Sequence, residues 1–142
     1  MVWKFFQTIK PKDMSTWRQK AIECAPGLKK NFNAKGLTPY SVFMELLPLA
    51  REAHIIKDNK TLQSIYDYAE WCFRQKDQKL WNAAGVSFYE HLGDTPETFP
   101  GFTKWVKKDI YLDIRELLDR RCEDSKMKEL DNYYGLKGLN NK

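Results

Sequence analysis

The segment most informative about the fold is residues 77–92, DQKLWNAAGVSFYEHL. If it is helical, its apolar side chains lie on almost every side of the helix and leave little polar surface. A helix with so little polar surface is typical of one packed among other helices. Asp77 can cap its first turn, and the small side chains at 83–85 would let a neighbouring helix come close. Gly85 costs about 1 kcal/mol in helix propensity, which we expect close packing to offset. The segment therefore predicts a central, buried helix near residues 78–92.

Helical periodicity continues on both sides of this segment. Thr38 and Pro39 form a strong helix start, because the threonine caps free N–H groups and proline needs no N–H in the first turn. Pro48 is expected to kink or restart that helix. Helices are expected over 13–24, from 38 to near 58, over about 62–76, over 78–92, and from 105 past 121 with a continuation through 126–130. No segment shows a convincing strand pattern. The sequence predicts an all-α fold, with one domain over 1–142 built as a bundle of about five helices.

Three segments are expected outside these helices. Residues 27–36, GLKKNFNAKG, are polar and resemble a loop or a frayed turn. Residues 93–101, GDTPETFPG, hold two Gly and two Pro, which is typical of a loop. The C-terminal residues 132–142 have two Gly and no helical period, so a mobile tail is expected there.

Aromatic residues are unusually frequent, at 14% of the chain. This is more than a core of this size usually needs, so some rings are expected at the surface, where Trp and Tyr often anchor partners. The alternative is that the rings fill wide gaps between helices.

The cysteines and the hydropathy pattern indicate a compartment. Cys24, Cys72 and Cys122 are far apart and never form a CxxC pair, which argues against zinc or disulfides and for reduced thiols. No secretory apolar run of about 7–15 residues follows Lys4, and no stretch approaches the roughly 18 apolar residues of a membrane span. We expect a cytoplasmic protein that does not enter the membrane.

The net charge of +5 lies entirely in the first quarter of the chain. Residues 1–36 carry eight Lys or Arg against Asp13 and Glu23, whereas the remainder is nearly neutral. A basic segment can attract nucleic-acid phosphates or an acidic protein, and it can equally be a solvated face. The Arg-rich clusters and Gly-aromatic motifs of nucleic-acid modules are missing, so a nucleic-acid partner is the less favoured interpretation.

No catalytic or metal-binding motif is present. His54 and His91 are expected at helix ends, where a positive ring suits the helix dipole, and no HExxH or paired Cys accompanies them. Ser87 lies outside any GxSxG elbow. Glu90 and His91 are adjacent, so on a helix their side chains point about 100° apart and do not converge. We predict a non-enzyme without metal or cofactor.

The central run resembles a motif of small helical bacterial proteins that look like the immunity proteins of polymorphic or contact-dependent toxin systems. In that group an acidic residue and an Asn precede an apolar turn and a Ser-aromatic-x-Glu-x-Leu ending. The matching positions are Asp77, Asn82, Val86, Ser87, Phe88, Glu90 and Leu92. The resemblance covers about residues 20–120 and implies binding of a protein, such as a toxin domain, rather than catalysis. The basic N-terminus departs from the acidic character of nuclease inhibitors.

These observations favour a protein–protein interaction module, with an immunity protein that occludes a toxin as its leading form. The alternative is a nucleic-acid-associated protein that uses the basic residues 1–36.

The expected contact surface centres on the loop at 93–101. Phe99, Phe102 and Trp105 lie in or beside this loop, where Pro and Gly stiffen the chain. Rings on a preorganised loop bind with little ordering cost. Tyr89 and His91, just before the loop, complete the predicted partner-binding set. The alternative is that Phe102 and Trp105 begin the buried stripe of the last helix.

Overall fold

A computed structural model describes residues 15–136, and every regular element in that range is helical. The predicted all-α class is confirmed, but eight α-helices replace the five expected. The α-helices are α2 (Thr16–Cys24), α3 (Lys29–Phe32), α4 (Pro39–Ile56), α5 (Asn59–Phe73), α6 (Gln78–Ser87), α7 (Phe102–Trp105), α8 (Lys108–Asp119) and α9 (Asp124–Tyr133). Short 3-10 helices are η1 (Pro26–Leu28), η2 (Tyr89–His91) and η3 (Phe99–Gly101). No helix within 15–136 is both long and apolar enough to cross a membrane.

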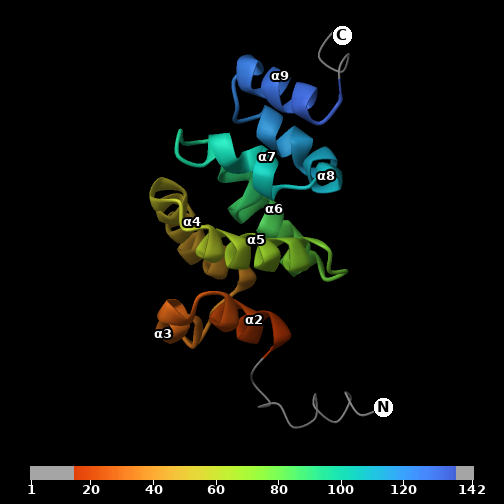
Figure 1. Cartoon of the computed structure of the whole chain (residues 1–142). Helices are drawn as coiled ribbons and strands as arrows, with labels where there is room; N and C mark the ends of the chain where they lie inside the picture. Colours follow the sequence, from red (N-terminus) through yellow and green to blue (C-terminus); the bar gives the residue numbers. More distant parts are fainter. Residues whose placement is uncertain (1–14, 137–142) are drawn as a thin grey trace, which may run out of the picture.

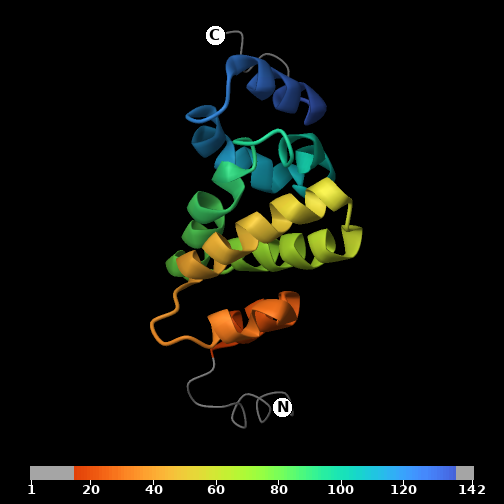
Figure 2. The same cartoon turned by 90° about the vertical axis from the view of Figure 1, so that its left-hand side faces the viewer.

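The helices are stacked roughly in chain order along the molecule (Figure 1). α2 and α3 form one end, α4 and α5 the next layer, and α9 the opposite end. The same order holds in the view turned by 90° (Figure 2). The molecule is therefore an elongated stack of short layers, whereas the sequence suggested a bundle around one helix.

α6 does lie in the middle of this stack, where it contacts α4, α5 and α8. Its buried residues are Leu80, Ala83, Ala84 and Gly85. The helix ends at Ser87, earlier than the predicted 92, and η2 then brings Tyr89 and Leu92 into the core. Trp81 is 40% exposed, so the prediction that this helix is buried on all sides was wrong.

Close packing does not require glycine at position 85. A Cβ atom there would lie 3.6 Å from Leu117 Cδ1 and 3.9 Å from Phe73 Cε1, which is ordinary van der Waals contact. Gly85→Ala should therefore raise the free energy of unfolding by about 1 kcal/mol, because alanine favours the helix and its methyl group fits. Urea denaturation measures this change. Gly93→Ala should destabilise instead, since its Cβ would lie 2.4 Å from Cys122 Sγ; a destabilised Gly85→Ala would contradict the argument.

α4 begins and ends close to the predicted bounds. The Thr38 side chain accepts a hydrogen bond from the Ser41 N–H at 3.2 Å, and the Ser41 hydroxyl accepts one from the Thr38 N–H at 2.9 Å. This capping box supports the first turn. The helix then runs through Pro48 to Ile56 without a new start. Asp58 caps α5, as expected.

The long helix predicted from Trp105 onward is interrupted: α7 ends at Trp105, and the rest is divided into α8 and α9. Val106 and Lys107 are extended, and Val106 is buried with its carbonyl accepting a hydrogen bond from the Tyr134 hydroxyl at 2.5 Å. Neither residue is Gly or Pro, so the break follows from this distant contact and not from local propensity.

Two further segments differ from the sequence predictions. Residues 27–36, expected as a loop, contain η1 and α3, where Phe32 is buried and its carbonyl accepts a hydrogen bond from Arg18 at 2.7 Å. Residues 132–136 of the predicted tail belong to the described fold, because α9 reaches Tyr133 and the buried Tyr134 stacks on Tyr111 at 4.4 Å. The rest of that tail, 137–142, and the start of the basic segment, 1–14, lie outside the described residues.

Candidate binding site

Two of the five predicted partner-binding residues belong to the core. Phe102 is fully buried and meets Tyr111 edge-on at 6.0 Å between ring centroids. Tyr89 is also fully buried and meets Phe73 edge-on at 5.6 Å. Neither ring is accessible to a partner of the folded protein, so the prediction was wrong for these two residues.

The loop around Phe99 packs against the body of the protein. Phe99 is partly buried, and Lys126 Nζ lies 5.2 Å from its ring centroid. Thr98 is fully buried and its hydroxyl donates to the carbonyl of Leu92. A Cβ at Gly101 would lie 2.7 Å from His54 Cε1. These contacts give the loop a structural role, while partner contact by Phe99 stays a prediction.

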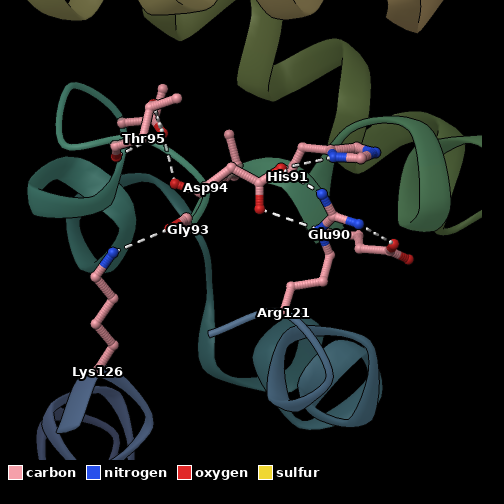
Figure 3. A network of polar contacts seen from close by, with 9 residues as sticks. Glu90, His91, Gly93, Asp94, Thr95, Arg121 and Lys126 are labelled. Carbon is pink, nitrogen blue, oxygen red and sulfur yellow. Dashed lines mark hydrogen bonds and ion pairs between the residues drawn. The ribbon is translucent and has the colours of Figure 1, made fainter. Parts of the chain in front are cut away.

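His91 takes part in a polar network that ties this loop to the helices after it (Figure 3). Arg121 donates to Asp94 through Nε at 3.0 Å and Nη2 at 2.7 Å, and its Nη1 lies 3.5 Å from Glu90. His91 Nδ1 lies 2.9 Å from the same Asp94 carboxylate. Lys126 Nζ donates to the Gly93 carbonyl at 3.2 Å.

The network is better suited to clamping the loop than to catalysis. Hydrogen bonds from Arg121 hold the pKa of Asp94 below its ordinary value, and the guanidinium neutralises that carboxylate. A His–carboxylate pair activates a nucleophile only when a hydroxyl or thiol lies beside the free ring nitrogen. Within residues 15–136 the recorded polar contact of the His91 side chain is the one to Asp94.

Trp105 is the predicted residue that lines a cavity. This cavity, of about 500 Å³, lies where α5, the α7–α8 segment and the end of α9 meet, and we call it the α5–α9 groove. Its lining comprises Gln63, Tyr66, Asp67, Glu70, residues 103–108, Tyr133 and Tyr134. The three contributing segments lie far apart in the sequence.

Aromatic rings form one wall of the groove. Trp105 stacks on Tyr66, with 5.5 Å between ring centroids and an interplanar angle of 8°. His54 Nε2 and the Tyr66 hydroxyl share a hydrogen bond at 2.9 Å, which fixes the stack from α4. At the α9 end, Tyr133 is 62% exposed. The groove thus combines a rigid stacked pair with one accessible ring.

The charges of the groove are only partly neutralised. Lys107 Nζ lies 2.9 Å from Glu70, which also pairs with Arg74 at 2.9 Å. Lys104 Nζ lies over the Trp105 ring at 5.2 Å. No hydrogen bond or ion pair within the described part of the chain involves the ammonium group of Lys104 or Lys108. Two cations of the lining, Lys104 and Lys108, and one carboxylate, Asp67, are therefore without an ion pair among the described residues.

Glu70 is held ionised by its neighbours. Partial burial raises the pKa of Glu70, but hydrogen bonds from Lys107 and Arg74 outweigh burial and hold the pKa below its ordinary value. The carboxylate therefore keeps Lys107 neutralised at neutral pH, and Lys104 and Lys108 are the cations left to attract an anion.

The groups that could support chemistry elsewhere are poorly placed. Burial raises the pKa of the Cys24 and Cys72 thiols to about 12, so both are protonated and weakly nucleophilic at neutral pH. Among residues 15–136, no group of three or more His, Cys, Asp and Glu side chains is arranged to hold a metal ion.

Stability should fall in mildly acidic solution because of His54. In the folded chain, burial lowers the pKa of His54 below its ordinary value of 6.5. At a pH between the folded pKa and this ordinary value, His54 binds a proton in the unfolded chain but not in the folded chain. The free energy of unfolding should then decrease as the pH falls from about 7 to about 5. Urea titrations across this range measure the slope, and His54→Gln should flatten it. An equal slope in the variant would assign the effect to other groups.

Part of the basic N-terminal segment is used within the fold. Arg18 donates to the carbonyls of Phe32 and Ala34 at 2.7 and 3.1 Å. Lys20 lies 5.0 Å from the Trp71 ring centroid. These contacts join α2 to its neighbours, so Arg18 and Lys20 have structural roles whatever partner the segment meets.

Sequence reasoning missed most of the groove. Lys104, Lys107 and Lys108 flank Trp105, and this local clustering of lysines around a tryptophan was the available signal. Tyr133 was assigned to a mobile tail, and nothing in its local sequence indicates that it lines the same groove as Lys108 and Trp105.

Comparison with known proteins adds one match. Residues 18–122 match a family described as a domain of unknown function, DUF7674. No curated protein and no solved structure matches the chain.

Proposed function

The chain belongs to the DUF7674 family, whose function is unknown, and from its own geometry we propose that it is a protein-binding module that holds an acidic segment of another protein in the α5–α9 groove. The observation that carries the proposal is the pair of unneutralised cations, Lys104 and Lys108, beside the stacked Trp105.

Charge and shape both favour such a ligand. Carboxylates of an acidic segment would meet the two ammonium groups, and the stacked rings offer a rigid apolar surface that loses little entropy on binding. A volume of about 500 Å³ admits a few side chains of a partner. Because the groove lies between three elements, a segment of a partner can cross it and continue beyond it on both sides.

The proposal includes the immunity-protein role suggested by the central motif. A helical protein that binds an acidic surface of a toxin domain could neutralise it by covering its active site. The groove supports the binding step of such a role, and a partner encoded beside this chain would be the first to test.

The experiment uses a short fluorescent peptide of alternating Glu and Gly, titrated with the full chain and followed by fluorescence anisotropy. Lys104→Gln combined with Lys108→Gln should weaken binding by about threefold to tenfold, as expected for two exposed ion pairs. Binding should also weaken as salt is added. The matched control is Lys60→Gln with Lys79→Gln, which removes the same charge from exposed positions outside the groove.

The outcomes separate the alternatives. An equal loss in both double variants would mean that net charge, and not the groove, attracts the peptide. A single-stranded oligonucleotide that displaced the peptide and itself required Lys104 and Lys108 would support phosphate binding instead. No binding at low salt would reject the proposal.

A further inference from the structure

One wall of the groove comes from outside the region that matches the family. The match ends at residue 122, and α9 begins at Asp124. α9 contributes Tyr133 and Tyr134 to the groove. The lysines and Trp105 lie within the matched region. The groove of this chain is therefore completed by α9, a helix that follows the matched region.

α9 is fixed against α8 by a buried ion pair. Asp131 accepts hydrogen bonds from Arg115 Nε at 2.9 Å and from the Tyr111 hydroxyl at 2.5 Å. Met127 and Leu130 add buried apolar contacts. A buried charge pair of this kind specifies one docking position more than it adds stability, so the rings of α9 are held in a defined place.

The end of α9 is also joined to the α7–α8 segment. Tyr134 stacks on Tyr111 and donates to the Val106 carbonyl, between Trp105 and Lys107. The Lys108 ammonium lies at the same end, 4.0 Å from the position of a Cβ atom on Gly135. Gly135 has φ of +79°, which favours glycine and turns the chain there. The Lys108 side chain and the exposed Tyr133 ring thus line the same groove, with the Lys108 ammonium close to the end of α9.

We propose that α9 is the selectivity element of the groove, so that the preferred ligand has an apolar side chain directly beside its acidic residue. The carboxylate meets Lys108, and the neighbouring apolar side chain lies on Tyr133. This inference rests on the proposed function, since it concerns the same groove. It specifies which partner sequences bind more tightly, and it assigns this preference to Tyr133.

The test compares two peptides of equal charge. One is the Glu-Gly repeat, and the other is the same peptide with one central Gly replaced by Leu. The Leu peptide should bind the full chain about fivefold more tightly, as expected from partial burial of a leucine side chain. Tyr133→Ser should abolish this preference, so that the Glu-Gly peptide and the Leu-containing peptide bind the variant with equal affinity.

The control is Trp81→Ser, which removes an exposed ring on α6 outside the groove and should keep the preference. Thermal melting of Tyr133→Ser should match that of the unaltered protein, because the ring is largely exposed. If both peptides bind equally to the unaltered chain, or if Tyr133→Ser keeps the preference, the selectivity proposal is overturned while acidic-segment binding stands. If neither peptide binds, the proposed function itself fails.

Discussion

Replacing Phe102 with alanine should lower the free energy of unfolding by about 3–5 kcal/mol. The ring is fully buried at the start of α7 and contacts Tyr111 edge-on. Its removal would leave a cavity between α7 and α8 that the stacked helices cannot readily close. The free energy is measured by urea denaturation at neutral pH.

Phe99→Ala is the matched control, since it removes the same ring three residues earlier from a partly exposed position. It should cost clearly less than Phe102→Ala, because water already reaches one side of the ring. Equal costs would mean that Phe99 also belongs to the core. A Phe102→Ala protein with unaltered stability would contradict the assignment of Phe102 to the core and would reopen its role in binding.

Local sequence signals predicted the parts of the fold that depend on local chemistry. Thr38 and Pro39 start α4, and Asp58 and Asp77 cap the next two helices, because capping requires only nearby side chains. Helical periodicity also predicted helices from 38 to near 58 and over about 62–76, close to the bounds of α4 and α5. These features can be predicted since the groups involved are a few residues apart.

The features that the sequence did not predict depend on contacts between segments that are far apart in the chain. The break at Val106 is held by Tyr134, and the helical turn of α3 is held by Arg18. No proline or glycine marks the break, so helical periodicity continued through it. The number of helices was underestimated for this reason.

The candidate site was predicted only through Trp105. Aromatic excess correctly suggested that some rings reach the surface, yet the ring with the greatest exposure, among those described, is Tyr133 in the supposed tail. Phe102 and Tyr89 were assigned to binding because composition does not distinguish a ring that fills a core from one that meets a partner. Only the tertiary fold brings α5, the α7–α8 segment and the end of α9 to one groove.

Replacing Asp131 with alanine should lower the free energy of unfolding by about 3 kcal/mol, the lower end for breaking a buried ion pair. The Asp131 side chain is only 2% exposed, whereas that of Arg115 is 20% exposed, so the arginine can regain some water. The Tyr111 hydroxyl would lose its acceptor within the core. Burial raises the pKa of Tyr111 and the Asp131 carboxylate raises it further, so this hydroxyl stays protonated and would bear the cost of a lost hydrogen bond.

Asp109→Ala provides the control for this change. Asp109 pairs with Arg74 at 2.7 Å, but its side chain is 62% exposed, and such surface pairs contribute about 0–1 kcal/mol. Hydrogen exchange should show where the Asp131 variant opens: amides of α9 should exchange much faster, while those of α4 and α5 stay protected. The same variant should lose the preference for the Leu-containing peptide, because Tyr133 would no longer be held beside Lys108. Uniformly faster exchange along the chain would instead mean that the ion pair supports the whole stack and that α9 does not open by itself.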